Sequence, residues 1–306
     1  MHSHDHHHHH SHEVSAEVIA GRAFKIGIAL NIVFVIAEVI AGLRYNSMAL
    51  LTDAGHNLSD VGSLALSLLA FTLARKKATA VFTYGYKKTT VLAALTKSVV
   101  LLVAVGIMAY ESVRRLHHPE IVEGGIVAWI AGAGILINGL SAFLFFKDKE
   151  KDLNVKSAYL HLAADALVSL GVVIAGLIIL YTGWDWVDSV MGLIIALVIL
   201  AGTWNVLVES FKLSVDAVPK GINIDEIKAL ILKNESILNV HHIHIWPLST
   251  TENALTAHVT IAESLSFDEK MLVVKNLRHT LEHHHVHHST IEMDNGNNKN
   301  EACERH

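Results

Sequence analysis

The sequence contains almost no cysteine and comparatively little charge. Cys303 is the only cysteine in 306 residues, which excludes an internal disulfide framework and any CxxC metal or redox motif. Charged residues make up 17% of the chain, whereas an average soluble domain carries about 25%. The net charge of −5 with neutral histidines gives no reason to expect a nucleic-acid partner. The HExxH motif is also absent, so the class of metalloenzyme that depends on it is excluded.

Apolar residues are abundant instead: they make up 52% of the sequence, and the mean hydropathy is +0.40. They gather in six runs, each long enough to cross a hydrocarbon core of about 30 Å as a helix. The predicted spans are Ala23–Leu43, Ser47–Ala74, Thr89–Ser112, Ile121–Phe146, Val155–Tyr181 and Val187–Val208. Glycines in the fourth span favour close helix packing. The fold class expected for residues 18–211 is therefore a six-helix transmembrane domain.

Basic residues are distributed unevenly over the two sides of this domain. Twelve lysines and arginines fall on one side, and only Arg44, Arg114 and Arg115 fall on the other. Because cytoplasmic connections are enriched in these residues, both termini are expected in the cytoplasm. The first span is long and lacks a convincing cleavage site, so it does not resemble a secretory signal peptide.

The chain begins with a histidine-rich stretch of low complexity. Eight of the first twelve residues are histidine, and such a polar segment cannot bury a core, so residues 1–17 are expected to be disordered. An expression tag is one interpretation. Because serine and aspartate interrupt the run, a native tail is the favoured one, and its composition is typical of metal binding.

After the sixth span the pattern changes to that of a small domain over residues 212–294. Ser266 and Glu269 form a capping box that starts a helix. The α-β-β-α-β order predicts an α+β, ferredoxin-like domain with its helices on one face of the sheet. A polar, flexible tail is expected at 295–306. The predicted elements are a helix at 225–234, strands at 240–246 and 254–261, a helix from 267 to about 283, and a strand at 289–293.

Two copies of a His-x-x-x-Asp pattern lie inside the predicted spans. His56 precedes Asp60 in the second span, and His161 precedes Asp165 in the fifth. Four positions are slightly more than one helical turn, so the members of each pair share a face. Two imidazoles and two carboxylates match the ligand set of tetrahedral zinc, and mixed nitrogen and oxygen donors also suit Cd²⁺ and Co²⁺. The pattern therefore predicts one intramembrane metal site.

The charges of this ligand set indicate what the site could do. Two ionised aspartates, two neutral histidines and one divalent cation sum to zero, which a membrane interior can hold. Without the metal, bare carboxylates there would be costly, and protons would restore neutrality. Metal and protons therefore compete for the same atoms, which is the physical basis of proton-coupled antiport.

Other polar residues in the spans admit more than one interpretation. A single His-Asp pair could be a hydrogen bond that stabilises helix packing, but two identical pairs favour a site. Asp53 shares the face of His56 and either lines an access path or caps the helix. Glu38 and Asn31, seven residues apart in the first span, either face the same cavity or bond a neighbouring helix, with packing slightly favoured.

Several motifs, taken in order, resemble those of the cation diffusion facilitator family, nearest to its zinc/cadmium/cobalt-exporting branch. The similarity covers about residues 18–294. The motifs are Leu51–Asp60, Phe82–Tyr86, His161–Asp165, Asp188, Asp216–Pro219 and Val240–Trp246.

This resemblance implies a homodimer with a metallochaperone-like cytoplasmic domain, in the bacterial cytoplasmic (inner) membrane. It implies alternating access and export driven by the proton gradient, with the transport site at the four residues of the two His-x-x-x-Asp pairs. Zn²⁺ is then the expected substrate, with Cd²⁺ or Co²⁺ as the alternative, and no organic cofactor is expected. A membrane metal sensor that does not transport is a competing hypothesis. A metalloenzyme is disfavoured because four protein ligands leave no open position for water.

The same resemblance implies metal ligands in the cytoplasmic domain. Matching positions are His241, His258 and Asp294, with Glu292 as a weaker fourth. Surface histidines without a defined site are the alternative. No site is predicted in the loop at residues 75–80, which lacks acidic and histidine residues. The run from His283 to His288 is interpreted as native.

Overall fold

The computed structural model describes residues 22–146 and 153–294. The predicted tails at 1–17 and 295–306 therefore lie outside the described residues, and so does the loop at 147–152.

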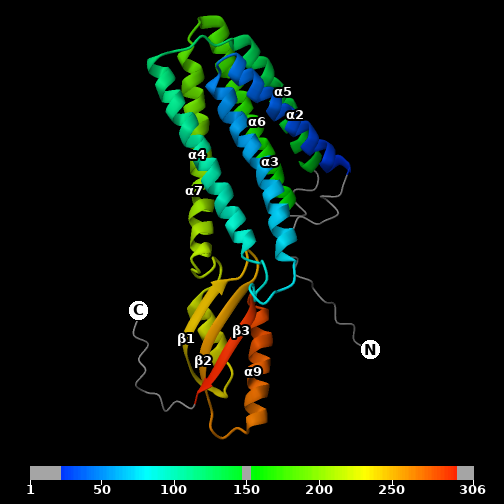
Figure 1. The fold of residues 1–306 in the computed structure, drawn as a ribbon, viewed down its shortest axis with the longest axis vertical. Coiled ribbons are helices and arrows are strands. Elements are labelled where there is room, and N and C mark those ends of the chain that lie inside the picture. The colour runs from blue at the N-terminus through cyan, green and yellow to red at the C-terminus, as the bar shows by residue number, and fades with distance from the viewer. Residues whose placement is uncertain (1–21, 147–152, 295–306) are drawn as a thin grey trace. The chain divides into compact units, whose positions relative to one another are not determined.

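The chain divides into two compact units. The first, called here the helical unit, comprises the chain up to Leu66 and Lys97–Asn205. The second, called the sheet unit, comprises Ser67–Thr96 and the chain from Val206 onward. In Figure 1 the helices of the helical unit lie side by side as a bundle. The long helices are α2 (Arg22–Arg44), α3 (Met48–Ala74), α4 (Thr89–His117), α5 (Gly124–Phe146), α6 (Leu153–Thr182) and α7 (Trp186–Ser214).

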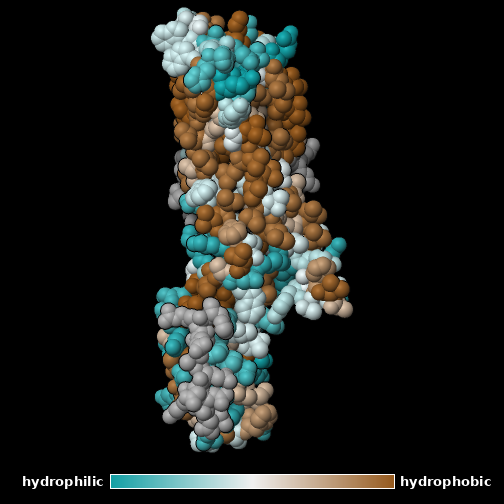
Figure 2. All heavy atoms as spheres, turned by 60° about the vertical axis from the view of Figure 1, so that its left-hand side comes forward, coloured by the Kyte–Doolittle hydropathy of each residue, from teal (hydrophilic) through white to brown (hydrophobic). Residues whose placement is uncertain are grey.

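Five of these helices, α3 to α7, are long and apolar enough to cross a membrane. Their outward residues are apolar: Ile107, Leu136 and Leu167 are each more than half exposed. Figure 2 shows apolar side chains covering most of the face that the helical unit presents in that view. Such a surface needs lipid rather than water around it. The 23-residue helix α2 occupies the position of the first predicted span, and its crossing remains a prediction.

Helices α5 and α6 approach each other closely at two glycines. A Cβ atom added to Gly124 would lie 2.5 Å from the carbonyl oxygen of Gly176, and one added to Gly176 would lie 2.7 Å from that of Gly124. Larger residues cannot occupy these positions without moving the backbones apart. The expected close packing therefore occurs at Gly124 and also at Gly134, where an added Cβ atom would lie 2.6 Å from the Phe34 ring. Gly132 and Gly139 have open space beside them.

The C-terminal part of the sheet unit folds in the expected α-β-β-α-β order. Strand β1 (Ile237–Pro247) pairs antiparallel with β2 (Asn253–Ile261), and β2 pairs parallel with β3 (Val286–Asp294). The sheet is therefore mixed, with strand order β1-β2-β3. Apolar residues of both helices, including Ile231 and Leu281, form one core with apolar residues of the strands, including Leu255. The elements are α8 (Ile224–Leu232), β1 (Ile237–Pro247), β2 (Asn253–Ile261), α9 (Phe267–Glu282) and β3 (Val286–Asp294).

Several predicted element limits were wrong. The third span was expected to end at Ser112, but α4 continues to His117, and α7 continues past the expected Val208 to Ser214. The last strand begins at Val286 rather than Ser289, so part of the histidine run lies in β3. Hydropathy marks where a span leaves the apolar core, whereas backbone hydrogen bonding continues into polar residues beyond it.

Candidate metal centre

Helices α3 and α6 carry the two predicted histidine–aspartate pairs. His56 and Asp60 lie one turn apart within α3, and His161 and Asp165 lie one turn apart near the start of α6. Both helices continue through these polar residues because each backbone N–H and C=O is satisfied inside the helix. The structure brings the two pairs together in the helical unit, with each histidine facing an aspartate of the other helix.

The four side chains converge on a common centre. His56 Nε2 lies 3.6 Å from Asp60 Oδ2 and 3.4 Å from Asp165 Oδ1. His161 Nε2 lies 3.0 Å from Asp60 Oδ2 and 3.6 Å from Asp165 Oδ2. Two metal–ligand bonds of about 2.0–2.1 Å at the tetrahedral angle separate their donor atoms by about 3.3–3.4 Å. The observed nitrogen–oxygen distances lie around that value. His56, His161 and Asp165 each offer one ligand atom within 4.8 Å of the others, and Asp60 contacts both histidines, so these side chains suit one tetrahedral ion.

Lys97 of α4 is a charged neighbour of this centre that the sequence analysis did not identify. Its Nζ lies 4.0 Å from Asp60 Oδ1, while Oδ2 of the same carboxylate faces His161. The ammonium group and a bound cation would both be attracted to Asp60. The signal was present in the sequence, because a lone lysine within an apolar run is costly unless it has an acidic partner.

A second polar layer lies beside the centre. Asn57 Nδ2 on α3 donates to Glu38 Oε2 on α2 at 3.3 Å, and the Ser169 hydroxyl on α6 donates to Asp53 Oδ2 on α3 at 3.3 Å. Glu38 and Asp53 are 0% and 1% exposed. These bonds connect α2 and α6 to α3. Asn31 is half-buried two turns before Glu38, and the predicted access-path role of these residues remains a prediction.

The start of α3 is held by a carboxylate from another helix. Asp188, in the first turn of α7, accepts hydrogen bonds from the Ser47 hydroxyl at 2.5 Å, from Met48 N–H at 2.5 Å and from Ala49 N–H at 3.4 Å. The first N–H groups of a helix have no partner inside it, and a negative charge is favoured there. Asp188 therefore acts as a cap for the helix that carries His56.

A second group of potential ligands lies on the sheet. The strand register pairs His241 of β1 with His258 of β2, and His258 with Glu292 of β3. Asp294 follows Glu292 by two residues and therefore lies on the same face of β3. This row across three strands brings together all four residues predicted for the cytoplasmic domain.

The distances within this second group are also short. His241 Nε2 lies 3.2 Å from Asp294 Oδ2, and His258 Nε2 lies 3.6 Å from Glu292 Oε2. One ligand atom from each of His241, His258 and Asp294 lies within 4.8 Å of the others. A register shift after His241 places His242 in a left-handed conformation with φ of 51°, and its ring stacks on that of His258. This irregularity could not be predicted from the sequence.

Comparison with protein families assigns both halves of the chain. Residues 24–213 match the model of the cation efflux transmembrane domain, and residues 219–295 match that of the cation efflux protein cytoplasmic domain. The chain belongs to the cation diffusion facilitator family. The predicted family is therefore confirmed. As a member, it is a multi-pass membrane protein with a cytoplasmic C-terminal domain, and a transporter rather than an enzyme.

Curated relatives of this cation diffusion facilitator align over most of its length. The cadmium, cobalt and zinc/H⁺–K⁺ antiporter of Bacillus subtilis is 35% identical over 263 residues, covering 85% of each chain. Zinc transporter ZitB of Escherichia coli is 34% identical and covers 85% of this chain and 83% of its own. The metal cation efflux system protein CzcD of Cupriavidus metallidurans is 34% identical, with 89% and 86% covered.

Proposed function

We propose that this protein exports Zn²⁺ from the cytoplasm in exchange for protons, with His56, Asp60, His161 and Asp165 as ligands of the transported ion. The observation that carries the proposal is the convergence of the four side chains at distances of 3.0–3.6 Å. This set contains two nitrogen and two oxygen donors from two helices, and zinc commonly takes four such ligands. The names of the Bacillus and Escherichia relatives, an antiporter and a zinc transporter, support the same substrate.

Proton exchange follows from the charges of the site. A divalent cation with Asp60 and Asp165 ionised has no net charge, and loss of the cation leaves two carboxylates in an apolar bundle. Protons on the site side chains restore neutrality after the metal leaves. Binding of one species therefore favours release of the other, and access from opposite sides of the membrane turns this competition into antiport.

The donor atoms of the site also bear on which divalent ion the protein prefers. Cd²⁺ and Co²⁺ accept the same mixed donors, and both ions appear in the name of the Bacillus antiporter. We place Zn²⁺ first because two imidazoles and two carboxylates at tetrahedral spacing suit it. Cd²⁺ or Co²⁺ as the main substrate is the alternative.

We further propose that the protein works as a homodimer in a bacterial cytoplasmic membrane, with both termini in the cytoplasm. Exposed apolar residues of the sheet unit, including Leu238, Phe267 and Leu272, are consistent with a second copy as partner. His241, His258 and Asp294, with Glu292 beside them, would bind zinc in the cytoplasmic domain.

Transport into inverted membrane vesicles tests the proposed mechanism. With a proton gradient imposed, wild-type vesicles should accumulate Zn²⁺ and release protons. A zinc-sensitive dye inside the vesicles measures the metal, and a pH probe measures the protons. Asp165→Asn keeps the shape of the side chain but removes its charge, so accumulation should be abolished. Asp268→Asn, at an exposed position of α9, is the matched control and should transport normally.

Three results would each contradict a different part of the proposal, and the same experiment distinguishes them. Normal zinc accumulation by Asp165→Asn would exclude the assigned ligand set. Accumulation above equilibrium after collapse of the proton gradient would exclude antiport. Zinc binding by folded protein without any accumulation would support the membrane-sensor hypothesis instead.

A further inference from the structure

Two exposed histidines on α9 point their ring nitrogens at each other. His279 and His283 are four residues apart, and their Nε2 atoms lie 3.4 Å apart. The ring planes are nearly perpendicular, at 77°, with centroids 4.8 Å apart. Residues at this spacing lie on one face of a helix. His283 follows the last residue of α9 but retains helical backbone angles, with φ of −67° and ψ of −14°, so the spacing is preserved.

The separation between these two nitrogens is that of two ligands on one metal ion. Two Zn–N bonds of about 2.0–2.1 Å at the tetrahedral angle place their nitrogens about 3.3–3.4 Å apart. In the absence of metal the same separation allows a hydrogen bond between the two rings, with one ring nitrogen as the donor. An ion between His279 and His283 would therefore require almost no side-chain movement.

Two further features favour a cation at this place. Glu282 Oε2 lies 3.9 Å from Nδ1 of His279, on the opposite side of the ring from the Nε2 atom that faces His283. That separation is too long for a hydrogen bond, but the negative charge of Glu282 favours a cation bound nearby. Both histidines also lie at the C-terminal end of α9, where the unpaired carbonyl groups of a helix favour positive charge.

We propose that His279 and His283 form a surface site for a divalent cation with a preference for imidazole, such as Zn²⁺. It shares no ligand with either group described above. Only two protein ligands are provided, so water completes the coordination and the ion exchanges readily. The neighbouring basic side chains Lys275 and Arg278, which line a hollow together with His279 and Glu282, also limit affinity. Rapid exchange suits a site that collects cytoplasmic metal before transport.

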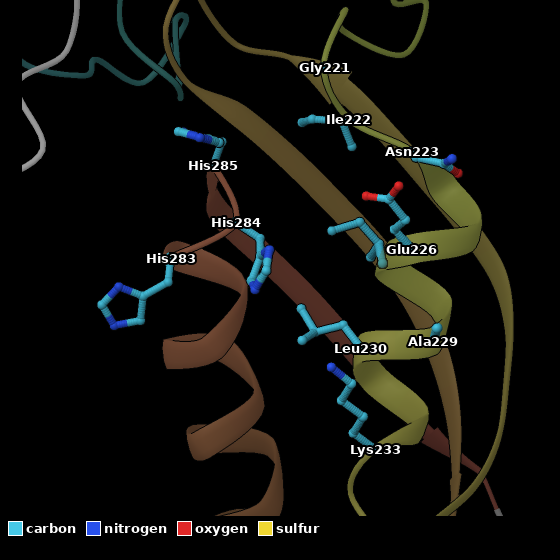
Figure 3. A pocket seen from close by; sticks show the side chains of 11 residues that line it. Gly221, Ile222, Asn223, Glu226, Ala229, Leu230, Lys233, His283, His284 and His285 are labelled. Carbon is cyan, nitrogen blue, oxygen red and sulfur yellow. The ribbon is translucent and has the colours of Figure 1, made fainter.

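The adjacent histidines supply a natural control. His283, His284 and Leu230 line a second hollow, between α9 and α8. In Figure 3 the ring of His283 lies on the side of α9 remote from α8, whereas the ring of His284 lies between the two helices. His284 is five residues from His279 and therefore does not share a helix face with it. Replacing His284 should leave the proposed pair intact.

Residue-resolved protection in the full-length protein in detergent tests the proposal. Diethylpyrocarbonate modifies accessible imidazole rings, and tandem mass spectrometry locates each modified histidine. Increasing Zn²⁺ should protect His279 and His283 together, whereas Mg²⁺, which prefers oxygen ligands, should not. In His283→Gln, protection of His279 should require about ten-fold more Zn²⁺, because one of two linked ligands is lost. In His284→Gln, Zn²⁺ should protect His279 at the same concentration as in the wild type.

The outcomes separate this site from the transport site. Asp165→Asn should leave the protection of His279 unchanged, so failure of the transport mechanism does not affect this result. Equal modification of His279 with and without Zn²⁺ would overturn the proposal. So would a His283→Gln variant in which His279 is protected at the wild-type zinc concentration, because His279 would then bind zinc without His283.

Discussion

The hydroxyl group of Ser47 donates a hydrogen bond of 2.5 Å to the carboxylate of Asp188, 141 residues later in the chain. The same carboxylate accepts from the N–H groups of Met48 and Ala49, and all four residues are buried. The N-terminus of α3 is therefore fixed to the first turn of α7. Because His56 lies about two turns further along α3, this contact determines where one ligand of the proposed transport site is held.

Asp188→Ala should destabilise the protein in detergent. The substitution leaves several buried donors without an acceptor, and each such group costs about 1–3 kcal/mol. The measurement is the free energy of unfolding in a denaturant series. Asp185→Ala is the comparator: Asp185 accepts a single backbone bond, from Val122 at 3.0 Å, so its loss should cost about 0.5–1.5 kcal/mol. Equal effects of the two variants would contradict the capping role.

The sequence was sufficient to predict the proposed transport ligands, for a definite physical reason. Histidine and aspartate are costly in an apolar helix, so two pairs with one-turn spacing indicate a shared partner. Asn57 and Ser169 were missed because their roles depend on which helices are neighbours and how each is rotated. The lone Lys97 in an apolar run indicated an acidic partner, but not which one. Local spacing carries no information about rotation. The bulge at His242 was missed for a similar reason, since it changes the strand register without a proline or glycine to mark it.

The substitution Glu38→Gln distinguishes two roles for Glu38: holding α2 against α3, or lining the access path. Glutamine keeps an oxygen that can accept the bond from Asn57 Nδ2, now 3.3 Å long, and it fills the same volume. If Glu38 braces α2 against α3, zinc KM and proton coupling in vesicles should stay close to wild type. Glu38→Ala should instead lower the free energy of unfolding by about 1–3 kcal/mol, because Asn57 loses its acceptor. Loss of proton release in Glu38→Gln would favour the access path.

His56→Asp should change the metal preference. The substitution converts two nitrogen and two oxygen donors into one nitrogen and three oxygens, a set that suits Mn²⁺ better and Zn²⁺ less well. Vesicle uptake with a panel of Zn²⁺, Cd²⁺, Co²⁺ and Mn²⁺ should show zinc uptake falling relative to manganese uptake by about ten-fold, or about 1.4 kcal/mol. An unchanged order of metals would mean that His56 does not contact the ion.

The capping box of α9 should make the stability of the sheet unit depend on acid pH. Hydrogen bonds from the Ser266 hydroxyl and backbone N–H hold the pKa of Glu269 below its usual value. A carboxyl whose folded pKa is depressed contributes stability above its unfolded pKa, and this contribution is lost as pH falls through the folded value. Thermal unfolding between pH 7 and pH 3 should therefore show a smaller acid-dependent loss in Glu269→Gln than in wild type.

Zinc should stabilise the cytoplasmic domain through His241, His258 and Asp294. A ligand that binds only the folded state at about 100 times its Kd adds about 2.7 kcal/mol of stability, so a chelator should lower the melting temperature of this domain. In Asp294→Asn the carboxylate 3.2 Å from His241 Nε2 becomes an amide, which is a poor zinc ligand, and the response to chelator should disappear. Glu263→Gln, at an exposed position after β2, should keep the response to chelator. A chelator effect of equal size in all three proteins would assign the stabilising zinc to a different site.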